Sequence, residues 1–330
     1  PPPPPPPPPP DNEVVILDPP PLTLLEANLP DGSAPENGAL TQSGTFTVTA
    51  PDGLQTLTVG GASVVNGGSV VATLPTITTG AGNELEIVSF SDNDDGTYTV
   101  GYAYTLKVNK VHEQPVNDDS LEQDFAVFAE DIDGDSATGT LTVEIIDDLP
   151  TVSVGAAEDA EVPVLETLDT GSDDAGDFSV LFTKDVEAGA DGLASESAVY
   201  SLSVSEAGTG LTSGGKPITV AVDASGQVVG STDDGAVFTI GVDAAGNVQV
   251  SQLAAIDHLG ELDDGDATNN SANKAILSDG NVLLTKTVAV ADGDDDAASD
   301  AATVDISSAF GFVDDLPTVS VGAAEDAEVP

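Results

Sequence analysis

The chain has 330 residues and carries 58 Asp and Glu against six Lys and no Arg, which gives a formal net charge of −52. Nucleic acid is excluded as a partner because phosphate binding needs a basic surface, and without a long apolar run we expect no direct membrane insertion. There is no Cys to form disulfides, so cations are the expected partners of this acidic chain.

The first ten residues are all proline. Such a run forms a polyproline II rod, here roughly 30 Å long at ~3.1 Å per residue. We expect residues 1–19 to be a proline-rich spacer; the alternative is a ligand for proline-reading domains. Because the chain begins in this run and ends inside a repeated segment, we expect it to be an internal part of a longer protein.

Residues 20–150 have the pattern of many short strands. Residues 44–49 and 54–59 alternate apolar and polar side chains, and the PDG sequence between them predicts a tight turn. Residues 97–108 form a longer run of the same kind. Short strands with a turn about every ten residues are typical of an antiparallel immunoglobulin-like β-sandwich, which we predict for this first module.

Residues 151–317 predict a second, longer β-sandwich repeat module. The expected fold class is therefore all-β, with tandem antiparallel immunoglobulin-like sandwiches. Strand-like runs lie at residues 178–182, 198–204, 218–222, 236–240, 247–250, 282–290 and 302–306. Residues 253–262 are the one segment in which we expect a helical turn. Strand order cannot be predicted from one sequence.

A stretch of seventeen residues, DDLPTVSVGAAEDAEVP, occurs at residues 147–163 and again at residues 314–330. The two copies start 167 residues apart, which is about one domain length. Each copy opens with two acids and Leu-Pro before an alternating run, a pattern that predicts a domain junction. We expect residues 318–330 to be the truncated start of a further repeat, so that neighbouring repeats of the chain are partners of one another.

An acidic turn precedes the last strand of each module. The first is EDIDGD at residues 130–135 and the second is ADGDDD at residues 291–296. Oxygen donors at alternate positions, with Gly to bend the backbone, suit a Ca²⁺ ion. The spacing is not that of an EF-hand, because Gly134 comes too early and Thr142 stands where a bidentate Glu is required. The alternative is a solvated hairpin turn, which also uses Asp and Gly.

The junctions supply further carboxylates. Asp147 and Asp148 cannot approach Glu26, or the group of Glu158, Asp159 and Glu166, without repulsion. A divalent ion shared between the end of one domain and the start of the next would remove that repulsion, so we predict that calcium stiffens the junction at residues 147–150. The predicted metal ligands are Glu26, Asp131, Asp133, Asp135, Asp147, Asp148, Glu158, Asp159, Asp292, Asp294, Asp296, Asp314 and Asp315.

Two other functions are rejected. Residues 210–216, GLTSGGK, have the spacing of a phosphate-binding P-loop, but Pro217 stands where Ser or Thr must bind Mg²⁺. The two histidines, His112 and His258, lie in different modules, and no carboxylate pair stands out for glycosidase-type catalysis. We therefore predict no catalytic residues and no enzyme activity.

Several segments resemble a known family. Residues 131–150, DIDGDSATGTLTVEIIDDLP, and residues 310–317, FGFVDDLP, look like the module endings of giant bacterial RTX adhesins, the type I-secreted, LapA- and BapA-like biofilm proteins. The stretch from residue 253, LAAIDH, to Asp296 is similar to the long repeat of type I secretion targets. Residues 44–61 and 96–106 resemble immunoglobulin-like units of the same adhesins. The glycine-rich nonapeptide repeats of the RTX β-roll are absent.

The resemblance implies an extender segment of a secreted protein at the bacterial cell surface. Its tandem sandwiches would be stiffened by calcium and would support adhesion and biofilm formation. The calcium ligands implied are Asp131, Asp133, Asp135, Asp147 and Asp148, with Asp292, Asp294, Asp314 and Asp315 in the second module. The alternative is that one module binds a glycan or another surface ligand through exposed aromatic residues. We expect the candidates Phe178, Phe182, Tyr200 and Phe238 to face the core instead, and the adhesive target is unknown.

Overall fold

The computed structural model describes residues 12–113, 119–258 and 274–313. Within these ranges the chain consists of β-strands joined by turns and a few short 3₁₀ segments. Two compact units are present: unit 1 comprises Pro1–Thr151, Val186–Glu196 and Val290–Ala298, and unit 2 comprises Val152–Asp185, Ser197–Ala289 and Ser299–Pro330. No helix in the described part of the chain is long and apolar enough to cross a membrane. The module boundaries expected from the sequence stay a prediction.

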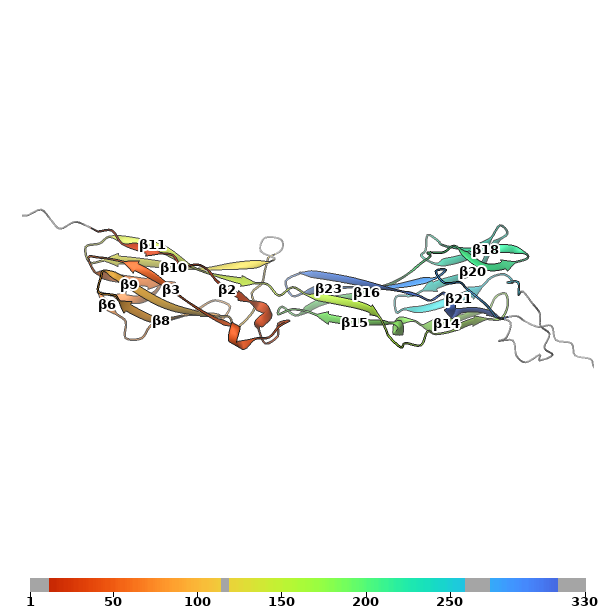
Figure 1. Ribbon diagram of the computed structural model, residues 1–330, viewed down its shortest axis with the longest axis horizontal. Coiled ribbons are helices and arrows are strands. Elements are labelled where there is room, and N and C mark those ends of the chain that lie inside the picture. Colours follow the sequence, from red (N-terminus) through yellow and green to blue (C-terminus); the bar gives the residue numbers. More distant parts are fainter. Residues whose placement is uncertain (1–11, 114–118, 259–273, 314–330) are drawn as a thin grey trace, which may run out of the picture. The chain divides into compact units, whose positions relative to one another are not determined.

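Unit 1 contains a β-sandwich, in which β3, β8 and β9 lie in one layer and β10 and β11 in the other (Figure 1). The sheet orders are β1-β3-β9-β8-β7 and β2-β11-β10-β4-β5-β6. The strands are β1 (Val15–Leu17), β2 (Leu22–Leu25), β3 (Thr41–Thr49), β4 (Leu54–Val59), β5 (Ala62–Asn66), β6 (Ser69–Val70), β7 (Thr76–Thr78), β8 (Glu84–Asp92), β9 (Thr97–Thr105), β10 (Ser120–Asp131) and β11 (Ser136–Ile146).

The core of unit 1 follows from the alternation of side chains along these strands. β3 pairs with β9 over its whole length, with Thr41 opposite Thr105 and Thr49 opposite Thr97. Since successive side chains point to opposite faces, every second residue enters the core. The side chains that do so include Phe46, Val48, Val100, Tyr102, Tyr104, Leu141, Val143 and Ile145, all of them buried. Each buried aliphatic side chain stabilises the fold by about 1.5–3 kcal/mol.

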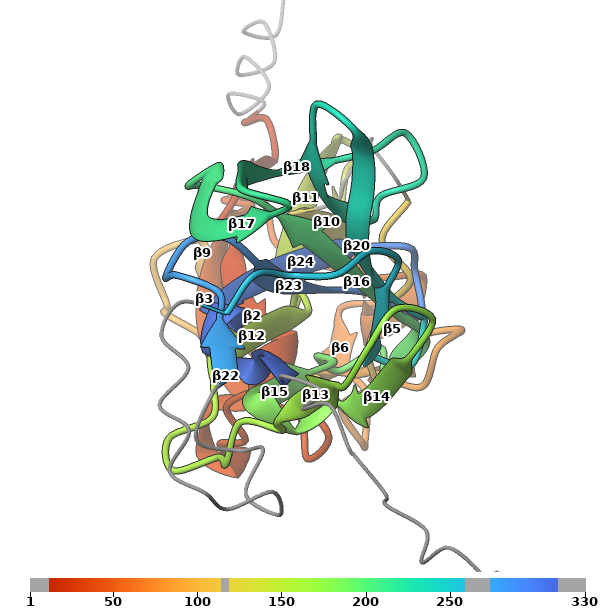
Figure 2. The ribbon, with the colours of Figure 1, turned by 90° about the vertical axis from the view of Figure 1, so that its right-hand side faces the viewer.

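Unit 2 contains the remaining sheets, β12-β15, β13-β25-β22, β14-β21-β20-β19-β18-β17 and β16-β23-β24; Figure 2 shows β16, β23 and β24 beside one another. The strands are β12 (Thr151–Ala156), β13 (Leu165–Thr167), β14 (Asp173–Asp177), β15 (Phe182–Glu187), β16 (Leu193–Ser203), β17 (Gly208–Ser213), β18 (Lys216–Val222), β19 (Val228–Thr232), β20 (Gly235–Val242), β21 (Asn247–Gln252), β22 (Lys274–Ile276), β23 (Leu283–Asp292), β24 (Ala297–Asp305) and β25 (Phe310–Val313). A few of these strands end or begin in the segments that belong to unit 1.

Glycine opposite an aromatic residue recurs in the two units. Gly44 lies opposite Tyr102 in the β3–β9 ladder, and Gly230 lies opposite Phe238 in the β19–β20 ladder. A Cβ at Gly44 would stand 2.5 Å from the Tyr102 hydroxyl, and one at Gly230 would stand 2.3 Å from the Phe238 ring. Each ring therefore needs a residue without a Cβ, which is glycine, opposite it on the neighbouring strand.

The all-β fold class with tandem sandwiches is confirmed. The helical turn expected at residues 253–262 is wrong for Leu253–His258, which form no helix, while the rest of that segment lies outside the described residues. The segment is instead tied to the sheet: the backbone N–H groups of Leu253 and Ala254 donate to the carbonyl of Val237 at 2.7 and 3.0 Å. These bonds to a distant strand outweigh the local preference for a turn.

Candidate metal centre

Unit 1 gathers a group of buried and half-buried acids from segments that are far apart in the sequence. We call this group the acidic cluster, and its members are Glu26, Asp147, Asp148, Asp191, Asp292, Asp294 and Asp296, with His112 beside them. All of these residues belong to unit 1, because its second and third segments carry Asp191 and the acids from Asp292 to Asp296.

The first two carboxylates are placed by an unusual strand pair. β2 runs parallel to the end of β11, with Leu25 opposite Ile146. Glu26 directly follows β2 and Asp147 directly follows β11, so both residues leave the sheet at the same end. Glu26 starts a short 3₁₀ turn, η1 (Glu26–Asn28), and its Oε1 accepts a 2.6 Å hydrogen bond from the backbone N–H of Lys110.

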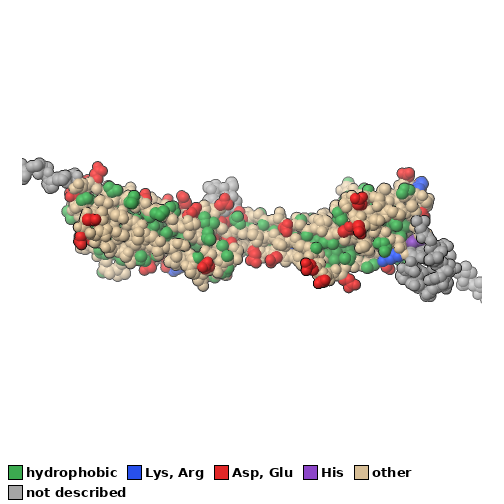
Figure 3. Space-filling model, in the orientation of Figure 1, with side chains coloured by type: hydrophobic (Ala, Val, Ile, Leu, Met, Phe, Trp, Pro, Cys, Tyr) green, Lys and Arg blue, Asp and Glu red, His purple; other side chains and the backbone are tan. Residues whose placement is uncertain are grey.

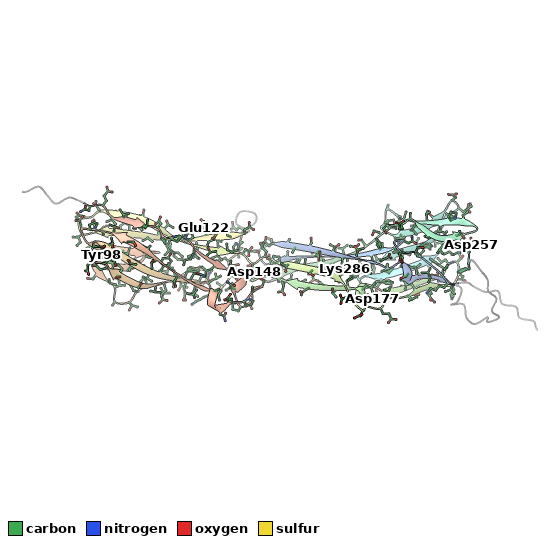
Figure 4. All side chains as sticks on the ribbon, viewed as in Figure 1. Tyr98, Glu122, Asp148, Asp177, Asp257 and Lys286 are labelled. Atoms are coloured by element: carbon green, nitrogen blue, oxygen red, sulfur yellow. The ribbon has the colours of Figure 1, made fainter. Side chains whose placement is uncertain are left out.

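Asp148 is held by a different loop. Its two carboxylate oxygens accept hydrogen bonds from the backbone N–H of Ser33 at 2.7 Å and from the Ser33 hydroxyl at 2.5 Å. Asp147 Oδ1 accepts a 2.7 Å bond from the backbone N–H of Asp148, which orients the pair. Figure 4 labels Asp148 at this end of unit 1. The Asp-Asp sequence of the repeated stretch is thus fixed in space by neighbouring backbone.

The turn between β23 and β24 supplies three more acids. Asp292 Oδ1 accepts a 2.8 Å bond from the backbone N–H of Asp296, and the Asp292 N–H donates to the Asp296 carbonyl at 3.0 Å. The next acid, Asp294, accepts a 2.9 Å bond at Oδ2 from the backbone N–H of His112. Asp191 Oδ1 accepts a 2.6 Å bond from the Asn109 amide. The carboxylates of Asp191, Asp292 and Asp294 are therefore each held by a backbone or amide N–H through one oxygen.

These second oxygens are buried without hydrogen-bond partners. They are Glu26 Oε2, Asp147 Oδ2, Asp191 Oδ2, Asp292 Oδ2 and Asp294 Oδ1. Glu26 and Asp292 are 0% exposed and Asp294 is 7% exposed. A buried carboxylate oxygen without a partner is costly, because the protein does not replace the water that it has lost. Five such oxygens in one place make the acidic cluster a candidate cation site.

The pKa values of the cluster express the same imbalance of charge. Burial raises the pKa of Glu26 to about 8, and repulsion by nearby carboxylates adds to this rise although the Lys110 N–H bond opposes it. Burial likewise raises the pKa of Asp147 to about 8 and that of Asp292 to about 6. The pKa of Asp191 is also raised by burial. A divalent cation would lower all four, because it favours the ionised form.

The distances between donor atoms suit a metal ion. Two sets of three residues bring one ligand atom each to within 4.8 Å of one another, namely Glu26, His112 and Asp147, and Asp147, Asp294 and Asp296. Oxygens bound to one Ca²⁺ at about 2.3–2.6 Å can lie up to about 5 Å apart. Asp147 belongs to both sets.

A third set lies in the turns of unit 1 that precede β4 and β11. It consists of Asp52, Asp131 and Asp133, with ligand atoms within the same 4.8 Å. Burial would raise the pKa of Asp131, but hydrogen bonds from Asp133 and from the backbone of Gly134 and Asp135 outweigh it and lower the pKa. Asp131 Oδ2 is nevertheless buried and unpartnered. A buried carboxylate oxygen that is ionised in this way is a candidate metal ligand.

The structure brings together only part of the ligand set expected from the sequence. Glu26, Asp147, Asp148, Asp292, Asp294 and Asp296 lie in the acidic cluster, and Asp131 and Asp133 lie in the third set, with Asp135 in the same turn. Glu158 and Asp159 are exposed and belong to none of the three sets among the described residues, and Glu166 pairs with Lys274 at 2.7 Å. Asp314 and Asp315 lie outside the described residues. The assignment of ligands stays a prediction.

Three residues of the acidic cluster and the third set were not predicted: His112, Asp191 and Asp52. A signal for the two acids was present, because Asp52 stands in PDGL and Asp191 in ADGL, each directly before a strand, β4 or β16. The turn geometries also correspond, since the Gly53 N–H donates to the Ala50 carbonyl at 3.0 Å and the Gly192 N–H to the Gly189 carbonyl at 3.3 Å. No local signal marked His112.

The rejection of a phosphate site gains a physical reason. β17 and β18 form a hairpin over residues 208–222, and the N–H groups of Gly214 and Gly215 donate to the carboxylate of Asp257 at 3.0 and 2.7 Å. The Asp257 carboxylate, labelled in Figure 4, therefore already binds the N–H groups that a phosphate would need.

Comparisons with known proteins bear on the fold. Residues 161–307, less than half of the chain, match a family described as a domain of unknown function, DUF5801. No curated protein matches the sequence. The chain is similar to solved structures of protocadherin gammaB7 domains EC3–6, with 11% identity over 92% of this chain and 48% of that one and a TM-score of 0.22.

Two further structures are similar at the same level. Drosophila N-cadherin EC1–4 has 11% identity over 92% of this chain and 49% of that one, with a TM-score of 0.23. The C-terminal domain of the Streptococcus pyogenes antigen I/II-family protein AspA has 9% identity over 80% of this chain and 92% of that one, with a TM-score of 0.19. The chain thus spans about half the length of the two cadherin structures. The architecture of this chain rests on the sheets described above.

Proposed function

We propose that this chain is a structural extender segment of a secreted bacterial cell-surface adhesin, in which calcium bound by buried acids stiffens the tandem sandwiches. The observation that carries the proposal is the set of five buried carboxylate oxygens without partners in the acidic cluster. Hard oxygen donors at this density are the ligands that Ca²⁺ requires. The module endings quoted above, which resemble those of RTX adhesins, add type I secretion and a role in adhesion and biofilm formation.

Calcium would act by tying distant segments to one another. The acidic cluster joins the ends of β2 and β11 to the loop before β16 and the turn after β23. Without a cation, the carboxylates of these segments repel one another and favour separation. With one bound, they are held at fixed distances, and the linker that follows Asp148 has fewer conformations. An extender needs this property, because a stiff segment transmits position and force better than a loose one.

The alternative, a glycan-binding module, finds no support in the four aromatic residues considered for it. Phe178 and Phe238 are 0% exposed and Phe182 is buried. The partly exposed Tyr200 contacts Phe182 with one edge and carries the Lys286 ammonium 5.7 Å from its ring centroid. A sugar platform needs an open ring face. The three buried rings offer none, and the Tyr200 ring already has Phe182 and Lys286 as neighbours.

Small-angle scattering tests the stiffening directly. We expect the profile of the full chain to change when EDTA replaces calcium, with a larger and better-defined maximum dimension in calcium. Sodium chloride at matched ionic strength is the control for screening, and Glu26→Gln should lose most of the calcium response. Identical profiles with calcium and with EDTA would refute the extender proposal.

A further inference from the structure

One imidazole lies among the carboxylates of the acidic cluster. His112 is 1% exposed, and its Nε2 is 3.7 Å from Glu26 Oε1. Two backbone bonds hold this geometry: the Lys110 N–H donates to Glu26 Oε1, and the His112 N–H donates to Asp294 Oδ2. With Asp147, the two side chains place one nitrogen and two oxygens within 4.8 Å of one another.

An imidazole nitrogen changes which metal the set prefers. Ca²⁺ takes oxygen ligands, whereas Zn²⁺ and other first-row transition metals bind imidazole well. Three protein ligands of the His and carboxylate type, with the fourth position open, are typical of a Zn²⁺ site. Tetrahedral bonds of about 2.0–2.2 Å place ligand atoms roughly 3.3–3.6 Å apart, close to the 3.7 Å found between Nε2 and Oε1.

We propose that Glu26, His112 and Asp147 bind a first-row transition-metal dication, with Zn²⁺ as the probe, beside a calcium ion at Asp147, Asp294 and Asp296. Asp147 would then bridge the two ions. In calcium alone both sets can hold Ca²⁺, as in the proposed function, on which this inference rests for the ion at Asp147, Asp294 and Asp296. What it adds is that the set with the imidazole prefers a transition metal to Ca²⁺.

A simple ion pair between His112 and Glu26 does not explain the arrangement. At 3.7 Å the two atoms are too far apart for a hydrogen bond, although the side chains are fully buried. Glu26 Oε2 and Asp147 Oδ2 are also buried without partners, so a proton on the imidazole would leave both oxygens unsatisfied. An ion bound by the three residues would give both carboxylate oxygens a partner.

The charge of the acidic cluster also calls for more than one ion. Seven carboxylates converge there, and a single Ca²⁺ would leave most of that charge uncompensated. Lys107 and Lys274 pair instead with Glu84 and Glu166, outside the cluster. Two dications that share Asp147 balance the site better than one.

The test is metal titration of the full chain at saturating calcium, so that the all-oxygen site is already filled. We expect Zn²⁺ to bind with a saturable heat in calorimetry, and Co²⁺ to give the intense visible absorption of a site with low coordination number. His112→Gln should lower the Zn²⁺ and Co²⁺ affinity at least tenfold. His258→Gln is the matched control, since it removes the other histidine of the chain, whose Nε2 is 2.9 Å from the Phe312 carbonyl.

Equal Zn²⁺ affinity of wild type and His112→Gln, or no saturable Zn²⁺ binding at all, would overturn this inference. Calcium-dependent melting of the same proteins separates it from the proposed function: Zn²⁺ can fail while calcium still stabilises, or the reverse. If His112→Gln does not fold, the imidazole NMR signals of the wild type decide, because Zn²⁺ should shift those of His112 and leave those of His258 in place.

Discussion

Glu26 is completely buried, and one of its carboxylate oxygens has no hydrogen-bond partner. Its other oxygen is fixed by the backbone N–H of Lys110, so the side chain cannot turn toward water. Burial therefore raises its pKa to about 8. Without a cation the residue destabilises the fold when ionised, and with a cation it becomes a ligand. Removing the charge of Glu26 should therefore stabilise the fold without a cation and reduce the stabilisation that a bound cation gives.

We expect Glu26→Gln to raise the melting temperature in EDTA at pH 8 and to reduce the gain on adding calcium by at least half. The substitution removes one buried negative charge, which is worth on the order of 1 kcal/mol without metal, but it also removes a ligand. The control is Glu122→Gln, an exposed acid on β10 that is labelled in Figure 4. A loss of stability in EDTA together with an unchanged calcium gain would contradict this prediction.

The raised pKa values also predict the pH dependence of stability without metal. Glu26 and Asp147 titrate in the fold near pH 8, and Asp292 near pH 6, all above their values in the unfolded chain. The folded state therefore binds more protons than the unfolded chain. The stability that these three acids contribute is fully present below about pH 4 and is lost as the pH rises through 6 to 8. Acids with lowered pKa, such as Asp243, act in the opposite sense but only below about pH 4.

Chemical denaturation in EDTA should thus give a lower free energy of unfolding at pH 8 than at pH 5. In excess calcium the difference should shrink or reverse, because the ion binds the ionised carboxylates and competes with protons. The same slope with pH in both conditions would show that the cluster does not bind calcium.

At the scale of elements, two hairpin turns share one geometry. The turn between β10 and β11 has Asp131 N–H donating to the Asp135 carbonyl at 3.0 Å, and the turn between β23 and β24 repeats this bond from Asp292 to Asp296. In both turns the first Asp also accepts a backbone N–H from the residue four positions on. The first Asp of each turn is thus both a cap of the turn and a candidate ligand.

Replacing the first Asp of a turn by Asn separates its role as a cap of the turn from its role as a candidate ligand. In Asp131→Asn the Oδ1 acceptor for Gly134 and Asp135 remains, so we expect a cost of less than about 1 kcal/mol in EDTA but a smaller calcium gain. Asp243→Asn is the matched control, because Asp243 Oδ1 caps an exposed turn through Ala245 and Asn247 and lies in none of the metal sets. Calcium gains that fall equally in the two variants would contradict a metal role for Asp131.

Much at this scale could be predicted from the sequence, because strands and turns are local. The alternation at residues 44–49 and 54–59 predicted β3 and β4, and the two acidic turns were recognised by their composition. The parallel pairing of β2 with β11 could not be predicted, since it joins residues about 120 positions apart. His112 was missed for the same reason: its role depends on Glu26 and Asp294, which no local pattern connects to it.

For the molecule as a whole, net charge is the dominant quantity. A formal charge of −52 opposes compactness, and Figure 3 shows acidic side chains over the visible face with few lysines among them. Exposed charges are screened by any salt, whereas buried carboxylates are screened much less. Calcium at the acidic cluster should therefore stabilise the chain beyond the effect of ionic strength, and this difference separates binding from screening.

Differential scanning calorimetry of the full chain over a calcium titration, at constant ionic strength, tests the central claim most directly. At a calcium concentration of 100 times Kd, one site stabilises the fold by about 2.7 kcal/mol, or roughly 5–10 °C in Tm for a domain of this size. We predict a rise of at least this order that saturates and is reversed by EDTA, with Glu26→Gln losing most of it. A Tm that does not change with calcium, or that responds equally to sodium, would contradict calcium binding by the buried acids.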